Sequence, residues 1–166
     1  AKMTYLDTLI PLKVIGKVGA DYKIQLSPNR TAYIGEQYVS PMPRGTFAPQ
    51  SLTDKIRVYA DSSLEYVKLN LFQKLPYQSF QLLDPSRIVV DVFGATSNTN
   101  WINFPDTLRE IKQVSYEQLA DGIFRISISL KHKQHWGHRI YYEGNNLVIQ
   151  VRRQPTRLSL DALTIA

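Results

Sequence analysis

Three histidines stand close together in the last third of the chain, at positions 132, 135 and 138. Neutral imidazoles bind zinc well, so the pattern His132-x2-His135-x2-His138 raises the hypothesis of a metal site. The spacing argues against it, because residues three apart on a strand point to opposite faces of the sheet. Gly137 disfavours a continuous helix, and the chain has no cysteine to add to the ligand set. We therefore expect a solvated basic turn here and no metal site.

Four aspartates, Asp84, Asp91, Asp106 and Asp121, are the candidates for acid–base chemistry. Hydrolytic carboxylate pairs need a cleft and a defined separation, and the sequence indicates neither. Asp91 lies in a strongly apolar segment, where a carboxylate needs hydrogen-bond partners or a cation. Arg87 would be about 13 Å away along the same strand, so we expect a neighbouring strand to supply the cation. The motifs of serine hydrolases, nucleotide-binding enzymes and zinc proteases are absent, and we predict that this chain is not an enzyme.

Aromatic and basic side chains are mixed in the last third of the sequence. Aromatic rings stack on the apolar faces of sugars, and Arg and Lys pair with carboxylates, so the mixture suits a ligand made of glycan and peptide. The same combination holds single-stranded nucleic acid. Packing in the core or at an edge is the competing interpretation, favoured for Trp101, whereas binding is favoured for Trp136 in its polar turn. The candidate ligand-binding residues are Trp101, Tyr116, Arg125, Trp136, Arg139, Tyr141 and Arg152.

The composition is that of a basic, globular protein. The chain has 166 residues, of which 43% are hydrophobic and 20% are charged, with a formal net charge of +6. A basic balance favours polyanionic partners, which include nucleic acid, anionic lipid and a cell wall that carries stem-peptide carboxylates. The absence of cysteine excludes disulfides and thiol nucleophiles. No apolar run approaches the roughly 18 residues that a membrane span requires.

A proline-rich joint divides the chain, and short strands are predicted on both sides of it. Upstream, strands are expected at Leu12–Val18, Tyr22–Leu26 and Thr31–Gly35. The pattern KVIGKVGADYKIQLSPNRTAYIGEQYV resembles the later part of a bacterial SH3-like barrel. This resemblance implies that residues 1–43 form SH3-like strands, followed by a linker at 44–53.

Downstream of the joint the pattern indicates an all-β fold with the strands of a β-sandwich at 54–154. In Phe124–Leu130, apolar and polar residues alternate, as in an antiparallel sheet with one buried face. A helical turn is conceivable only at Thr107–Gln113 and Tyr116–Ala120. The predicted strands are Ile56–Tyr59, Leu64–Phe72, Tyr77–Leu83, Arg87–Phe93, Glu110–Tyr116, Gly122–Leu130, Arg139–Tyr142 and Asn146–Arg152.

One segment carries the most specific pattern. In Tyr77–Ala95, a first strand ends at the turn Asp84-Pro85-Ser86, and a second strand, apolar enough to be buried on both faces, is closed by Gly94. With the later phrases Ile111–Gln118, Phe124–Leu130 and Gly144–Val151, it resembles the AMIN domain, the non-catalytic targeting module attached to bacterial N-acetylmuramoyl-L-alanine amidases.

The resemblance covers Asp54–Arg153 and implies a β-sandwich that binds peptidoglycan and positions an amidase, or a secretin, at the cell envelope. It implies no catalytic residue and no cofactor in this chain, and a periplasmic or extracellular location. An insertion at Thr96–Asp106 departs from the family pattern, so the binding face stays open.

The last residues extend the resemblance. Leu163–Ala166 is similar to the first residues of the catalytic domain of zinc amidases, so residues 155–166 are expected to lead into a downstream domain that holds zinc. The expected partner is therefore peptidoglycan, with envelope or divisome proteins as further partners. A single-stranded nucleic-acid-binding β domain and an interaction module of a secretin-type assembly are the alternatives.

Overall fold

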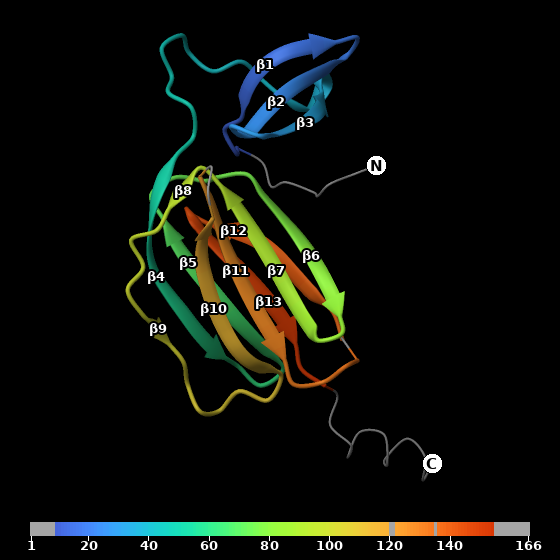
Figure 1. Cartoon of the computed structure of the whole chain (residues 1–166), viewed down its shortest axis with the longest axis vertical. Helices are drawn as coiled ribbons and strands as arrows, with labels where there is room; N and C mark the ends of the chain where they lie inside the picture. The colour runs from blue at the N-terminus through green and yellow to red at the C-terminus, as the bar shows by residue number, and fades with distance from the viewer. Residues whose placement is uncertain (1–8, 120–121, 135, 155–166) are drawn as a thin grey trace.

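The computed structural model describes residues 9–119, 122–134 and 136–154. These residues form thirteen β-strands and one short 3-10 helix, which confirms the predicted all-β fold (Figure 1). The predicted lead-in at 155–166 lies outside the described residues.

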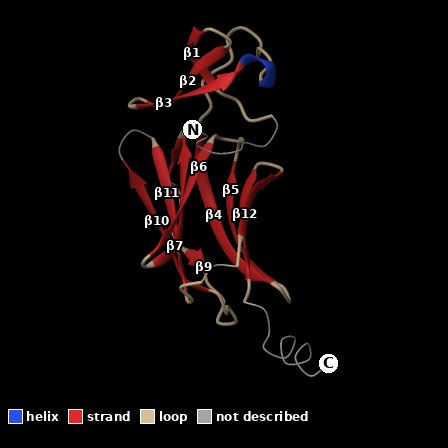
Figure 2. Cartoon of the chain, turned by 90° about the vertical axis from the view of Figure 1, so that its right-hand side faces the viewer, coloured by secondary structure: helices blue, strands red, loops and turns tan. Residues whose placement is uncertain are grey.

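A small antiparallel sheet comes first along the chain. Its strands are β1 (Lys13–Val18), β2 (Asp21–Ser27) and β3 (Arg30–Gly35), paired in the order β1-β2-β3 and followed by the 3-10 helix η1 (Glu36–Tyr38). The three upstream strands are thus confirmed, and their SH3-like character stays a prediction. This sheet lies beyond one end of the sandwich (Figures 1 and 2).

The two sheets of a sandwich follow, and Figure 2 shows them as separate layers. The first sheet has four antiparallel strands in the order β10-β11-β7-β6. The second has the order β12-β13-β5-β4-β8, with β9 paired to β4. The four-stranded sheet contains β6 (Tyr77–Leu83), β7 (Ser86–Phe93), β10 (Ile111–Leu119) and β11 (Ile123–Leu130). The six-stranded sheet contains β4 (Ser51–Ala60), β5 (Leu64–Leu71), β8 (Ala95–Thr96), β9 (Ile102–Asn103), β12 (His138–Glu143) and β13 (Asn146–Arg152).

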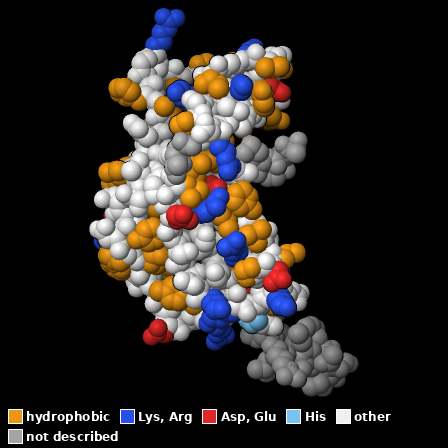
Figure 3. Space-filling model, viewed as in Figure 1, with side chains coloured by type: hydrophobic (Ala, Val, Ile, Leu, Met, Phe, Trp, Pro, Cys, Tyr) orange, Lys and Arg blue, Asp and Glu red, His pale blue; other side chains and the backbone are white. Residues whose placement is uncertain are grey.

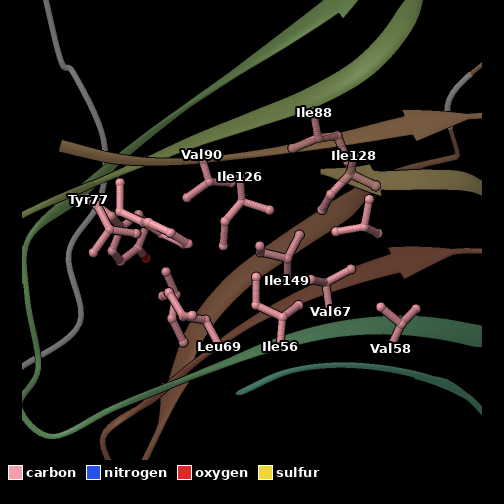
Figure 4. Packing of buried hydrophobic residues seen from close by; sticks show 14 of the residues in the cluster. Ile56, Val58, Val67, Leu69, Tyr77, Ile88, Val90, Ile126, Ile128 and Ile149 are labelled. Carbon is pink, nitrogen blue, oxygen red and sulfur yellow. The ribbon is translucent and has the colours of Figure 1, made fainter. Parts of the chain in front are cut away.

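The core fills the space between the two sheets (Figure 4). Each strand contributes alternate side chains to it, as the period of a strand requires. On β5, for example, Val67 and Leu69 are fully buried, whereas the intervening Lys68 points outward. β11 alternates in the same way, as predicted. Branched residues dominate this core, among them Ile56, Val67, Ile88, Val90, Val92, Ile126, Ile128 and Ile149.

β7 is buried on both faces, as its sequence predicts. Its outer face is covered by neighbouring side chains, because Arg125 on β11 reaches Asp91 and Arg30 on β3 lies 5.9 Å from the centre of the Phe93 ring. Arg30 also donates a hydrogen bond of 3.0 Å to Gln78 Oε1 on β6. Arg30 therefore connects the small N-terminal sheet to the four-stranded sheet.

Two segments differ from the sequence prediction because of strand pairing. β4 begins at Ser51, inside the predicted linker, since Ser51 and Leu52 pair in parallel with Ala95 and Thr96. The segments considered for helical turns contribute instead to β10, whose residues pair along their length with β11. The partner of Ser51 and Leu52 is more than 40 residues away in the sequence, so the local pattern does not reveal it, whereas β10 and β11 are consecutive strands of one hairpin.

The predicted turns are present. β6 and β7 form a hairpin in which Leu83 pairs with Ser86 around Asp84 and Pro85. At the β12–β13 hairpin, Glu143 pairs with Asn146, and Gly144 takes the positive φ of 62° that glycine accepts most readily.

Gly94 joins the two sheets at a close approach, and its replacement is expected to destabilise the fold. Its φ is 87°, and a Cβ on it would lie 2.6 Å from the carbonyl oxygen of Pro49. We expect Gly94→Ala to lower the free energy of unfolding by about 2 kcal/mol or more, because backbone strain and the clash add together. Urea titration measures this, with Gly122→Ala as the control, since its φ is 71° but no atom lies within 4 Å of its Cβ position. Equal losses in the two variants would contradict a role for the close approach.

Candidate functional site

The outer face of the six-stranded sheet gathers tyrosines and cations from four strands. The register places Tyr141, Val148, Lys68 and Arg57 in one row across β12, β13, β5 and β4. A second row contains Arg139, Gln150, Tyr66 and Tyr59. Neighbouring strands lie about 4.8 Å apart, so each row is about 14 Å long. We call the surface formed by Arg57, Tyr59, Tyr66, Lys68, Arg139 and Tyr141 the tyrosine face.

Two of its tyrosines form a stacked pair that is held in place. The rings of Tyr59 and Tyr66 lie 4.8 Å apart with an interplanar angle of 17°. The hydroxyl of Tyr66 donates a hydrogen bond of 2.7 Å to Asp61 Oδ2. Asp61 Oδ1 in turn accepts hydrogen bonds from the backbone N–H groups of Ser63 and Leu64, at 3.0 and 2.8 Å. The turn between β4 and β5 thus fixes the aromatic surface.

The electrostatics of the face keep its phenols neutral. The hydrogen bond to Asp61, together with burial, raises the pKa of Tyr66 to about 12. Burial, followed by the charge of Glu143, raises the pKa of Tyr59. Burial and the neighbouring Tyr59 likewise raise the pKa of Tyr141. The hydrogen bonds from Ser63 and then Tyr66 lower the pKa of Asp61, which stays ionised as the acceptor. At neutral pH the rings therefore carry no charge.

Cations lie among these rings. The guanidinium of Arg139 is 4.8 Å from the centre of the Tyr141 ring, a cation–π distance. Lys68 Nζ lies 3.3 Å from Glu143 Oε1, and Arg57 is exposed on the neighbouring strand. A surface of flat neutral rings and fixed cations can stack against sugars and pair with carboxylates.

A shallow pocket of about 330 Å³ continues the tyrosine face at the margin of β4. It forms where β4 has an irregularity of register, between Thr53 and Ile56, opposite β5. Arg57 belongs both to the pocket and to the face. The pocket is lined by Asp54, Lys55, Ile56, Arg57, Asn70, Trp101 and Asn103.

The structure brings four of the seven predicted site residues to this one sheet. Arg139 and Tyr141 form part of the tyrosine face, Arg152 is exposed at the end of β13, and Trp101 lines the marginal pocket. The sequence favours packing in the core or at an edge for Trp101; the core is excluded, because 61% of this side chain is exposed.

The other three lie elsewhere. Tyr116 packs against the core, stacks on Phe124 at 5.7 Å and donates a hydrogen bond to the carbonyl of Thr99. Arg125 forms an ion pair on the opposite sheet. Trp136 contacts His132 edge to face, with ring centres 5.6 Å apart, in the loop before β12.

Of the three histidines in the sequence pattern, His132 has a structural partner. His132 Nδ1 lies 2.9 Å from Oε2 of the buried Glu110, whose pKa is raised by burial. His135 lies outside the described residues. Within the described ranges, no group of three or more His, Cys, Asp or Glu side chains could hold a metal ion.

Sequence reasoning did not identify Arg57, Tyr59, Tyr66 and Lys68 as site residues. The signal was present as alternation, since Arg57 and Tyr59 on β4, like Tyr66 and Lys68 on β5, interleave with buried aliphatic residues. Only the pairing of the strands shows that their outward sides form one surface. Basic side chains are also spread along the face that Figure 3 shows, so net charge alone did not locate a site.

Comparison with known proteins found one family. The AMIN domain model matches residues 55–160, which includes nearly the whole sandwich. AMIN domains are non-catalytic modules that bind peptidoglycan or mediate interactions in envelope proteins. A comparison with curated protein sequences found no match. In the part of the chain that the structure describes, no helix is long and apolar enough to cross a membrane.

Proposed function

Because this chain belongs to the AMIN domain family, we propose that its sandwich binds peptidoglycan through the tyrosine face and thereby targets a larger protein to the cell wall. The observation that carries the proposal is the alignment of three neutral tyrosines with Arg57, Lys68 and Arg139 on one sheet surface.

The chemistry of the wall supports this choice of surface. Glycan strands present the apolar faces of sugar rings, on which the exposed Tyr59 and the half-buried Tyr66 and Tyr141 can stack. Stem peptides present carboxylates, which Arg and Lys bind as charge-assisted partners. The face extends over four adjacent strands, so an extended polymer can contact several of its side chains at once.

The opposite sheet fits the role less well. Its outer face carries Asp91 in an ion pair with Arg125 and, at one end, Phe93 beneath Arg30 of the N-terminal sheet. Arg125 is held there by a fully buried carboxylate. On the tyrosine face Lys68 pairs with the exposed Glu143, and Arg57 is itself exposed, so these cations are more available to a ligand.

The direct test is retention of the chain on insoluble peptidoglycan. We expect the double variant Tyr59→Ser/Arg139→Gln to bind about tenfold more weakly than the wild type, because it removes one ring and one cation from the face. The matched control, Tyr33→Ser/Lys112→Gln, also removes one tyrosine ring and one cation, from β3 and β10. Far-ultraviolet circular dichroism of both variants verifies that they are folded.

Two results would overturn the proposal. One is that the wild type is not retained on peptidoglycan at moderate salt. The other is that the control variant loses as much binding as the face variant. Binding to oligonucleotides instead of the wall, with a steep dependence on salt, would favour the nucleic-acid alternative.

We further propose that the protein served by this targeting is a zinc-dependent N-acetylmuramoyl-L-alanine amidase. The support is the sequence resemblance described above, and zinc would belong to the catalytic domain of that protein. The role of this chain is then affinity and placement, with the chemistry performed elsewhere.

A further inference from the structure

The pocket beside Trp101 has a composition different from that of the tyrosine face, because it combines one acid with two bases. Asp54, Lys55 and Arg57 lie around it, together with the side-chain amides of Asn70 and Asn103. Within the described residues, none of the three charged side chains forms an ion pair. The pocket thus offers both signs of charge to a ligand, with an excess of one positive charge.

The wall of the pocket is anchored in a way that holds Trp101 outward. The strap that carries it, residues 97–103, is fixed to β4 by a buried hydrogen bond of 2.8 Å between the hydroxyls of Thr53 and Thr99. The N–H of Asn98 also donates to Thr53 Oγ1, at 2.9 Å. At the other end of the strap, Ile102 pairs with Ile56 and packs against the core.

The strap is held from its other side as well. The hydroxyl of Tyr116 donates to the carbonyl of Thr99 at 2.9 Å, and Gln118 Oε1 accepts from the N–H of Ser97 at 2.7 Å. An exposed tryptophan on so fixed a segment loses little conformational freedom when a ligand covers it. This is the arrangement expected of a preformed stacking surface.

An unsatisfied polar atom adds to the argument. Asn70 lines the pocket, and its side-chain oxygen is buried without a hydrogen-bond partner among the described residues. A buried acceptor without a partner costs free energy, and a ligand N–H that reaches it would relieve that cost. The site therefore has two acceptors for a cationic or amide group, Asn70 and Asp54.

We propose that this pocket binds the zwitterionic end of a peptide: a centre with a free ammonium and a free carboxylate, within a ligand of net negative charge. Asp54 and Asn70 receive the ammonium, Lys55 and Arg57 receive the carboxylates, and Trp101 covers the apolar part of the chain. The inference rests on the proposed function. In the cell wall, the pocket would select stem peptides whose diamino acid has a free amino group and a free carboxylate. The tyrosine face then contacts the glycan, and the pocket binds the stem peptide.

The test uses the full chain and two soluble probes. One is a stem tetrapeptide that ends in meso-diaminopimelate and D-alanine, and the other is the same peptide with the side-chain amine acetylated. We expect the wild type to bind the free amine about fivefold more tightly, because a partly exposed ion pair contributes up to about that factor. Asp54→Asn should remove this preference, and Trp101→Ala should weaken binding of both peptides about tenfold.

Matched controls separate the pocket from general effects. Asp106→Asn removes an exposed carboxylate, and Phe47→Ala removes an exposed ring, both away from the pocket. Peptide-free glycan strands should bind the wild type and Asp54→Asn equally. Thermal unfolding of each variant verifies that the fold is retained.

The outcomes distinguish the two proposals. Retention on whole peptidoglycan without discrimination between the peptides, or discrimination that survives in Asp54→Asn, would overturn the pocket proposal and leave the targeting function standing. No retention on peptidoglycan overturns the targeting function itself. Tenfold weaker peptide binding by Trp101→Ala, with loss of the amine preference in Asp54→Asn, supports the pocket.

Discussion

Replacement of Glu65 by leucine is expected to lower the free energy of unfolding by about 3–5 kcal/mol, although Glu65 lies on a strand where every other inward residue is aliphatic. Its side chain is fully buried. Both carboxylate oxygens accept hydrogen bonds from three successive backbone N–H groups, those of Arg109, Glu110 and Ile111. Arg153 Nε donates a further bond of 2.8 Å.

The cost arises from the partners that the substitution leaves behind. Leucine would leave three backbone N–H groups and Arg153 Nε without their acceptor, and a buried donor without an acceptor costs free energy. These bonds also tie the segment before β10 to β5 and to the residue that follows β13. We therefore expect Glu65→Leu to loosen the seam between the two sheets, and not only to lower the overall stability.

Urea unfolding at neutral pH measures the loss, with Glu117→Leu, an exposed position on β10, as the matched control. A loss below 1 kcal/mol for Glu65→Leu would show that the buried carboxylate is dispensable.

The pH dependence gives an independent check. Burial acts to raise the pKa of Glu65, but the hydrogen bonds from Ile111, Arg109 and Arg153 outweigh it and the pKa is lowered. A carboxyl with a lowered folded-state pKa stabilises the fold fully above its unfolded value of about 4.5, and this stabilisation is lost as the pH falls through the folded value. The difference in stability between wild type and Glu65→Gln should therefore shrink below about pH 4.5. A difference that stays constant to pH 3 would contradict this assignment.

Removal of Arg125 should have an effect of similar size, about 3–5 kcal/mol, because it leaves Asp91 buried without its cation. Arg125 Nε and Nη2 donate to the two carboxylate oxygens of Asp91 at 2.7 and 3.0 Å, and the Asp91 side chain has no exposed surface. The two residues are directly paired across β11 and β7. Arg125→Leu is the informative variant, with Arg152→Leu, an exposed arginine on β13, as its control.

The double variant Asp91→Val/Arg125→Leu shows whether the loss in Arg125→Leu comes from the missing ion pair or from the charge of Asp91, left buried without a cation. Replacing both partners with apolar groups removes the uncompensated carboxylate, so we expect it to regain most of the stability lost by Arg125→Leu. Equilibrium unfolding of the four proteins of this cycle gives the answer. If the double variant is less stable than Arg125→Leu alone, the pair itself is a major source of stability.

Sequence reasoning predicts the strands well where they are long and regular. Ile88, Val90 and Val92 leave no doubt about a buried strand, and Asp84 with Pro85 marks the turn before it. The partner of Asp91 was correctly expected on a neighbouring strand, because residues on one strand are too far apart to pair. These features depend on local pattern and on simple geometry.

The binding surface was harder to predict, because it depends on which strands become neighbours. Tyr59 and Tyr66 are close in sequence but only cross-strand pairing stacks them, and Tyr141 joins them from the far side of β13. Tyr116 and Arg125 looked like ligand-binding residues from their types alone. The structure gives Tyr116 a half-buried hydrogen bond to Thr99 and Arg125 a buried carboxylate, and neither contact is visible in residue type or spacing.

The strap over β4 has one more consequence. A strand of ten residues at the margin of a sheet normally offers unpaired backbone groups to a second molecule, and this is a common route to aggregation. Here the two short strands β8 and β9 pair with β4 at Ser51–Leu52 and at Ile56–Arg57, with an irregularity of register between them. These pairs cover part of the β4 margin, so less of it is open to strand addition. Protection of this margin lowers the chance that neighbouring molecules associate through β4.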